Sequence, residues 1–174
     1  MNRFVIVASF FGVLTAAALA GDASHSMPGH EGSKELQMIK ALVGTWTGTS
    51  VMGETTHEAT VIYAVTAAGS AVVETLHPGS PMEMVSVYHD TDDGLAMTHY
   101  CALGNQPYMV QTEASKNSIT LTLSKDAAID VASEEHMHGV TLKFIGEDKL
   151  EAVWIHYKDG AEAGEVKATM TRQK

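Results

Sequence analysis

From Thr45 to the C-terminus, the sequence alternates between apolar and polar residues, with short turn-forming stretches between the alternating segments. Alternation with period two, rich in β-branched residues, is typical of strands that bury one face. The interruptions contain the Asp, Asn, Ser and Gly residues that favour turns. Ten strands are therefore expected, at 45–52, 56–66, 70–77, 83–90, 94–103, 107–113, 118–124, 136–145, 149–158 and 164–172.

One short helix is expected before the strands. Ser33 suits the N-cap position, Leu36 and Ile39 recur at helical spacing, and Gly44 ends the pattern. Ten strands with short links and no second helix predict an all-β fold, an antiparallel up-and-down barrel. Closing such a sheet leaves no exposed edge. A single barrel domain over residues 34–174 is the predicted organisation.

The first twenty residues are predicted to be a secretory signal peptide. They contain one basic residue, an apolar run and a small-residue site that favours cleavage after Ala20. Residues 21–33 are small and polar and are expected to form a disordered leader. The sequence thus predicts a periplasmic or secreted protein. Because no later stretch is long and apolar enough to span a bilayer, no membrane insertion is expected.

Charge and cysteine content narrow the functional classes. The formal net charge is −10, and such an acidic chain is poorly suited to nucleic acids or anionic lipid surfaces. Cys101 is the single cysteine, which excludes an internal disulfide. No feature of the sequence identifies a protein partner.

Three histidines fall within the last strands. On alternation, His136 and His138 share an inner face with Leu142 and Phe144, and His156 shares one with Trp154. A three-residue link between these strands pairs Phe144 with Leu150, Leu142 with Ala152 and Val140 with Trp154. The same register then sets His138 opposite His156.

A third strand adds to this group. In the segment 94–103, Met97, His99 and Cys101 lie on one face, which we expect to point inward. The interior would then hold several groups able to donate hydrogen bonds or bind a metal.

Three interpretations of these residues stay open. The histidines could satisfy one another as a polar patch at the barrel mouth. They could instead line a pocket for a small, mostly apolar molecule. The predicted ligand-binding residues are Met97, His99, Cys101, His138, Leu142, Phe144, Trp154 and His156. As a third possibility, His136, His138 and His156 could bind a divalent transition metal or haem iron.

Catalysis has weaker support. The sequence contains no nucleophile elbow, phosphate-binding glycine loop or HExxH motif. His99 and Cys101 are two residues apart on one face, so a Cys–His nucleophile is conceivable. An apolar surrounding raises the pKa of a thiol, however, and the prediction leans away from an enzyme.

The segment "LVGTWTG", residues 42–48, resembles the start of the first strand in lipocalin-like (calycin) barrels. That resemblance implies that Trp46 closes one end of the barrel beneath the preceding helical turn. The segments 69–89, 97–109 and 136–144 resemble an exported bacterial family, a lipocalin-like domain of unknown function. Tyr108 departs from that family, where a basic residue is expected after "GNQP".

A more distant likeness, through Gly44-x-Trp46-x-Gly48 and a ten-stranded barrel, is to the nitrobindins. Nitrobindins hold haem through a histidine on a late strand. The likeness implies that His156 would take that role in this chain.

Overall fold

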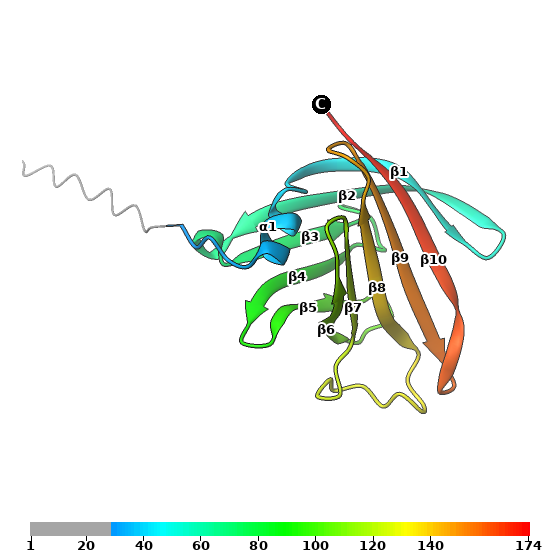
Figure 1. Cartoon of the computed structure of the whole chain (residues 1–174). Helices are drawn as coiled ribbons and strands as arrows, with labels where there is room; N and C mark the ends of the chain where they lie inside the picture. Colours follow the sequence, from blue (N-terminus) through cyan, green and yellow to red (C-terminus); the bar gives the residue numbers. More distant parts are fainter. Residues whose placement is uncertain (1–28) are drawn as a thin grey trace, which may run out of the picture.

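The computed structural model describes residues 29–174, which form one short helix and a closed antiparallel barrel (Figure 1). The signal peptide and most of the expected leader lie outside these residues. The elements are α1 (Lys34–Lys40), β1 (Gly44–Met52), β2 (Thr55–Thr66), a 3₁₀ turn η1 (Ala67–Gly69), β3 (Ala71–Leu76), β4 (Met84–Thr91), β5 (Gly94–Tyr100), β6 (Tyr108–Ala114), β7 (Ser118–Leu123), β8 (His136–Phe144), β9 (Lys149–Lys158) and β10 (Ala161–Arg172).

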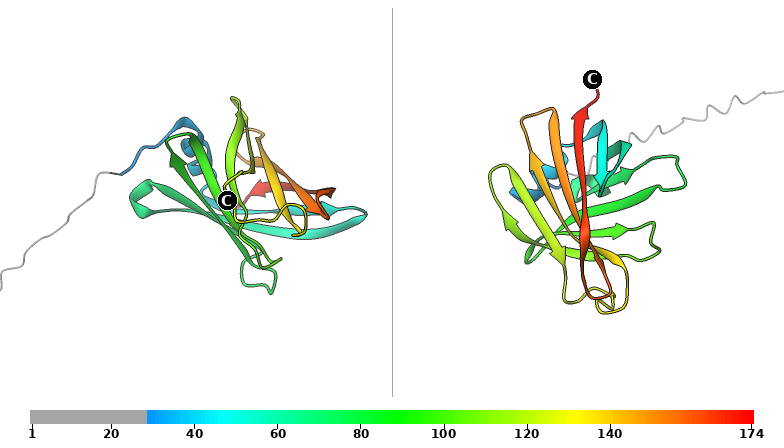
Figure 2. Two further views of the ribbon diagram at one scale, coloured as in Figure 1. Left: turned by 90° about the horizontal axis from the view of Figure 1, so that it is seen from below. Right: turned by 90° about the vertical axis from the view of Figure 1, so that its right-hand side faces the viewer.

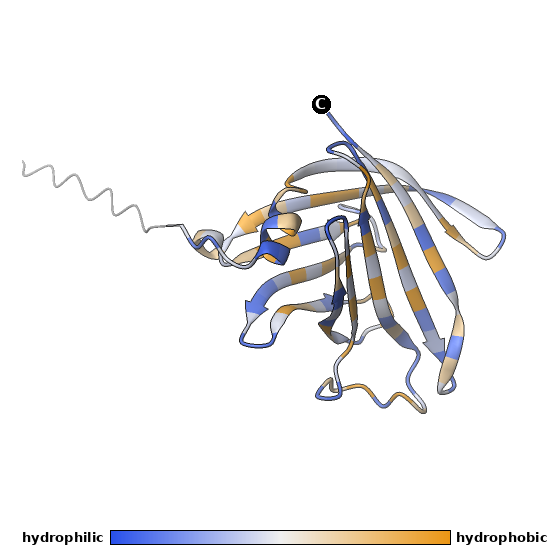
Figure 3. Cartoon of the chain, viewed as in Figure 1, coloured by the Kyte–Doolittle hydropathy of each residue, from blue (hydrophilic) through white to orange (hydrophobic). Residues whose placement is uncertain are grey.

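The strands follow one another around the barrel in chain order, and β1 pairs with β10 to close it. The prediction of a ten-stranded up-and-down barrel is confirmed. Orange and white or blue residues alternate along the strands in Figure 3, as the period-two pattern requires. Two further views show the strands wrapping around a common interior (Figure 2).

One strand ends earlier than expected. β5 stops at Tyr100 rather than at residue 103, because Cys101 begins a tight turn. The Cys101 carbonyl accepts a hydrogen bond from the Gly104 N–H, and the Cys101 N–H donates to the Asn105 carbonyl. Cys101 therefore lies just beyond the strand that was expected to aim it inward.

Helix α1 covers one end of the barrel. The Ser33 hydroxyl caps it by accepting from the Leu36 N–H at 3.0 Å. Leu36 and Ile39 are fully buried, and the helix packs against β2, β3, β4 and β5. The residues just before it also contact the barrel, since the His30 N–H donates to the Ala68 carbonyl and Ser33 binds Asp90.

Trp46 and Arg172 connect this end of the barrel to the end of helix α1. The Trp46 indole N–H donates to the Leu42 carbonyl at 2.7 Å, which places the ring beneath the end of the helix as expected. The Arg172 guanidinium lies 4.3 Å from the Trp46 ring centroid. It also donates to the carbonyls of Ala41 and Val43, each at 2.6 Å. A cation on the last strand thus satisfies carbonyls left unpaired at the helix end.

The predicted register of β8 with β9 is right over most of the hairpin. Phe144 pairs with Leu150, Leu142 with Ala152, and Val140 with Trp154. The predicted pairing of His138 with His156 is wrong. A β-bulge between Met137 and Gly139 shifts the register, so that Met137 lies opposite His156.

Within residues 29–174, no helix is long and apolar enough to cross a membrane.

Candidate functional site

The barrel interior holds a small cavity of about 80 Å³. Its walls come from strands on several sides and are mostly apolar. Its lining residues are Ser50, Ala59, Val61, Leu76, His77, Met84, His99, Met137, Trp154, Val166 and Ala168. Among these, His99 and Trp154 are 1% and 5% exposed, so the inner end of the cavity is shielded from bulk solvent.

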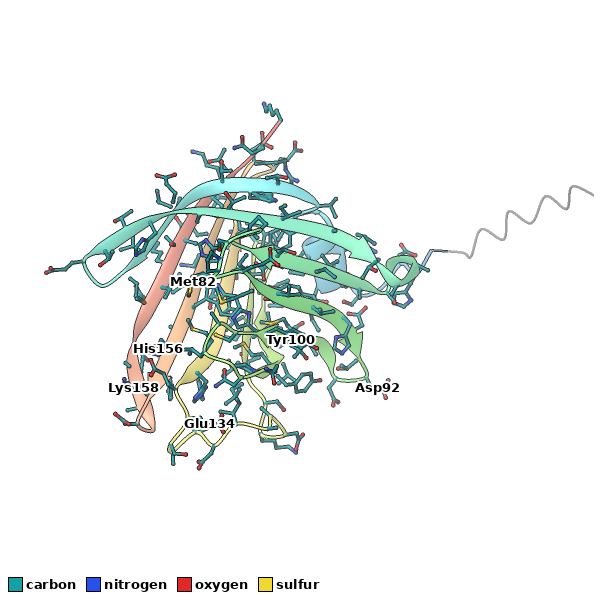
Figure 4. All side chains as sticks on the ribbon, turned by 180° about the vertical axis from the view of Figure 1, so that it is seen from behind. Met82, Asp92, Tyr100, Glu134, His156 and Lys158 are labelled. Carbon is teal, nitrogen blue, oxygen red and sulfur yellow. The ribbon has the colours of Figure 1, made fainter. Side chains whose placement is uncertain are left out.

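The cavity continues into a wider pocket of about 480 Å³ at the barrel mouth. The two spaces share Ser50, His77, Met84 and Val166. Met52 and Met82 lie at the rim and are each more than half exposed (Met82 is labelled in Figure 4). Unbranched thioether side chains adapt their shape to what they contact, so this rim suits a variable apolar group.

His99 is the polar group at the inner end of this cavity. Its ring packs against Trp154, with centroids 4.6 Å apart, and its Nδ1 lies 3.0 Å from the Ser86 hydroxyl. Burial lowers the pKa of His99 from 6.5 to about 4, which keeps the imidazole neutral at neutral pH. No side chain or backbone group of residues 29–174 forms a hydrogen bond with its Nε2.

Behind His99 lies a fully buried carboxyl. Glu74 on β3 accepts from the Tyr63 hydroxyl at 2.6 Å and from the Tyr88 hydroxyl at 2.9 Å. Burial raises the pKa of Glu74, while hydrogen bonds from Tyr63, Ser86 and Tyr88 oppose that rise. Ser86 lies opposite Glu74 in the β3–β4 pairing and 3.0 Å from Nδ1 of His99, so this group of polar residues extends from the core to the cavity wall.

The sequence analysis did not predict this network, although the alternation of residues along β3 indicates that Glu74 points inward. Val72, Glu74 and Leu76 share one face of β3, so an acidic residue stands among inward apolar ones. An inward carboxyl must find donors, and Tyr63 and Tyr88 on the neighbouring strands supply them.

The predicted pocket residues separate into distinct groups. His99 and Trp154 line the cavity. Met97 and Leu142 are fully buried in the core and do not line it. Phe144 lies beside a different pocket, at the end covered by α1. Burial raises the pKa of the Cys101 thiol, which is only half-buried and sits beyond the end of β5.

His136 and His138 do not face the cavity. The fully buried His136 has partners on both nitrogens: the Glu134 carbonyl at 2.7 Å from Nδ1 and His138 Nδ1 at 3.1 Å from Nε2. The His138 ring stacks on Tyr157 with centroids 3.9 Å apart and lines a separate surface pocket. These two imidazoles satisfy each other, as the polar-patch interpretation expects.

His156 lies apart from that pair. Its Nε2 is 2.9 Å from Glu135, and Lys158 binds the other oxygen of the same carboxylate at 3.3 Å. Figure 4 shows His156 and Lys158 at the same end of the barrel, beside the connection that carries Glu134. His156 also borders an open groove of about 670 Å³ whose walls include the charged Glu165 and Lys167.

The positions of His136, His138 and His156 can be compared with the prediction that they bind a metal or haem iron. In the part of the chain that the structure describes, no three or more His, Cys, Asp or Glu side chains are grouped so that they could hold a metal ion. The Nε2 atoms of His136 and His156 both have protein partners, so this arrangement leaves neither free for a metal or haem iron. The metal site at His136, His138 and His156 stays a prediction.

The fold and the cavity define a closed ten-stranded β-barrel with a small internal pocket. No protein-family model matches the chain, and no curated protein sequence matches it. Among solved structures, the chain is similar to a protein of unknown function from the DUF3598 family of Nostoc punctiforme, at 13% identity and a TM-score of 0.56. That alignment covers 78% of this chain and 49% of the other, so the chain spans about half the length of that protein. This likeness supports the barrel fold alone.

Proposed function

We propose that this barrel binds a small, mostly apolar molecule, with its polar end at His99 and its apolar part toward the mouth. The observation that carries the proposal is the interior cavity, which combines apolar walls with the buried imidazole of His99, whose Nε2 has no protein partner among the described residues. Pockets for small molecules commonly pair apolar surface with a few placed polar groups.

The dimensions suit a ligand that occupies both spaces. The inner cavity of about 80 Å³ holds a head group and a few carbon atoms, whereas the mouth pocket of about 480 Å³ holds a longer apolar part. Typical ligand sites measure roughly 300–1,000 Å³, which the combined space reaches. Burial of an apolar chain contributes roughly 25 cal/mol per Å² removed from water.

Export is the second part of the proposal. The apolar run and the small-residue site before Ala20 support secretion, which would place the binding site in the periplasm or outside the cell. Determining the N-terminus of the protein isolated from its host tests this directly. A mature chain that begins at Gly21 supports export, and a retained Met1 contradicts it.

The binding proposal is tested with N-phenyl-1-naphthylamine, a neutral apolar probe whose fluorescence rises in apolar surroundings. The key variant is Ala59→Leu, because Ala59 is 5% exposed and lines the inner cavity. The control is Ala64→Leu, on the same strand but exposed. We expect the probe to bind the wild type and Ala64→Leu, and to bind Ala59→Leu about tenfold more weakly or not at all.

A Soret band, or a metal that survives chelation and is lost in His138→Ala, would instead support the haem or metal alternative.

A further inference from the structure

The single hydroxyl hydrogen of Ser86 decides what the cavity presents to a ligand. Ser86 is fully buried, its hydroxyl lies 3.0 Å from Nδ1 of His99, and Glu74 is its cross-strand partner. A serine hydroxyl donates one hydrogen bond only. If the hydrogen points to Glu74, His99 must donate from Nδ1; if it points to His99, Nδ1 must accept.

The surroundings of Glu74 favour the first arrangement. The hydroxyls of Tyr63 and Tyr88 donate to its two oxygens, and Ser86 lies directly opposite Glu74 on the neighbouring strand, a set of donors that suits the carboxylate form. Hydrogen bonds to an ionised acceptor are about twice as strong as those between neutral groups. The Ser86 hydrogen is therefore drawn to Glu74, and Ser86 Oγ accepts from the Nδ1–H of His99.

A neutral imidazole carries one N–H, so a protonated Nδ1 leaves Nε2 with a lone pair. Within residues 29–174, Nε2 has no hydrogen-bond partner, while the ring that carries it forms part of the cavity wall. Within the described residues, Nε2 is not among the buried side-chain atoms that lack a partner, so it is accessible from the cavity. A molecule that displaces water from the cavity must therefore bring a hydrogen-bond donor to Nε2, because an acceptor left unpaired on binding is unfavourable.

We propose that the cavity selects neutral molecules that carry a hydrogen-bond donor, such as an alcohol or a phenol, with Nε2 of His99 as the acceptor. This inference rests on the proposed function and names its ligand class. Carboxylates are disfavoured at His99 because no Lys or Arg lines the inner cavity, and moving an unpaired carboxylate out of water is very unfavourable. The other histidine of the lining, His77, is shared with the mouth pocket. Ketones and ethers are disfavoured because they only accept.

The tautomer can be observed without any ligand. Long-range ¹H–¹⁵N correlation spectra of ¹⁵N-histidine-labelled protein distinguish a protonated ring nitrogen from an unprotonated one. The His99 signals are assigned by their absence in His99→Gln. We expect a protonated Nδ1 and an unprotonated Nε2 at neutral pH. A protonated Nε2 would overturn the inference and leave the proposed binding function untouched.

The ligand preference is tested with three molecules of equal chain length. Methyl hexyl carbinol donates and accepts, methyl hexyl ketone only accepts, and octanoate is an anion. Each is titrated against bound N-phenyl-1-naphthylamine. We expect the alcohol to displace the probe about tenfold more effectively than the ketone, which corresponds to about 1.4 kcal/mol, and octanoate to be the weakest.

Equal displacement by the alcohol and the ketone, or stronger displacement by octanoate, would overturn the inference. Failure of the probe itself to bind would contradict the proposed function instead.

Substituting Glu74 should abolish the preference for the alcohol over the ketone. In Glu74→Gln, an amide N–H faces Ser86, which frees the Ser86 hydrogen to point to Nδ1 of His99. Nε2 then carries the proton, and the ketone should bind as well as the alcohol. Glu113→Gln is the matched control, since Glu113 is exposed on β6 and lines neither the cavity nor the mouth pocket. An unchanged preference in a folded Glu74→Gln protein would show that Glu74 does not set the tautomer.

Discussion

His99 on β5 and Trp154 on β9 meet across the barrel interior, with ring centroids 4.6 Å apart and planes inclined by 43°. Their strands are not neighbours, since β6, β7 and β8 separate them around the sheet. The contact therefore joins two sides of the barrel and forms part of the cavity wall. It also keeps the imidazole away from water, which is the cause of its lowered pKa.

Stability should depend on pH through His99. Its pKa is about 4 in the folded protein, below the ordinary 6.5 that holds in the unfolded chain. The unfolded chain therefore binds the proton more readily, and the stabilisation present above pH 6.5 is lost as pH falls toward 4. We expect His99 to contribute a loss of up to about 3 kcal/mol over this range, at about 1.4 kcal/mol per pKa unit.

The measurement is urea unfolding of the wild type and His99→Phe at several pH values. The raised pKa of Glu74 acts in the opposite direction, so the difference between the two proteins isolates His99. His57→Gln, on the exposed start of β2, serves as the control. Identical pH profiles for the wild type and His99→Phe would contradict the buried, neutral imidazole.

Arg172 should matter for stability far more than a surface cation. Its guanidinium donates to the carbonyls of Ala41 and Val43 and lies over the Trp46 ring. Arg172→Ala removes these contacts together, and we expect a loss of roughly 2–4 kcal/mol. Arg172→Lys should recover only part of it, because an ammonium lacks the planar fork. Chemical denaturation measures both, and full recovery by lysine would contradict the geometric role.

The stability of the folded protein should depend on the hydrogen bonds that Tyr63 and Tyr88 donate to the buried Glu74 carboxyl. Tyr63→Phe leaves one oxygen of Glu74 without the hydrogen bond of 2.6 Å. We expect a loss of about 1–3 kcal/mol in the free energy of unfolding, the usual penalty for an unsatisfied buried group. Tyr100→Phe is the control, since Tyr100 is 50% exposed. Equal stability of the two variants would show that the hydroxyl does not support Glu74.

Gly48 should tolerate no side chain. A Cβ at this position would lie 1.9 Å from the Thr169 carbonyl oxygen on β10. The clash is with backbone, so relief requires β1 and β10 to separate where they close the barrel. We expect Gly48→Ala to lose more than about 3 kcal/mol or to fail to fold. Gly29→Ala, with its nearest atom at 4.0 Å, should behave as the wild type in thermal unfolding.

The fold was predictable because each strand can be recognised from its own stretch of sequence. Alternation and turn residues are short-range signals, and the up-and-down order needs only neighbouring strands to pair. The Gly-x-Trp-x-Gly stretch likewise pointed to Trp46 as the closing residue. Its partner Arg172 comes from the opposite end of the chain, and no local pattern connects the two.

The site was less predictable, because one bulge changed which histidines face inward. Strict alternation placed His138 beside His156, whereas the shift between Met137 and Gly139 puts Met137 opposite His156. A glycine within a strand often marks such a bulge, so Gly139 was the sequence feature that could have indicated it. His99 and Trp154 were placed correctly, because neither lies beyond an irregularity in its strand.

The most direct test of the account is an isotope-filtered NOE experiment on ¹³C,¹⁵N-labelled protein with unlabelled methyl hexyl carbinol. We predict intermolecular NOEs from the alcohol to the ring protons of His99 and Trp154, and from its alkyl chain to Met84. NOEs confined to outer residues such as Tyr157, or no NOEs at saturating alcohol, would contradict binding inside the barrel.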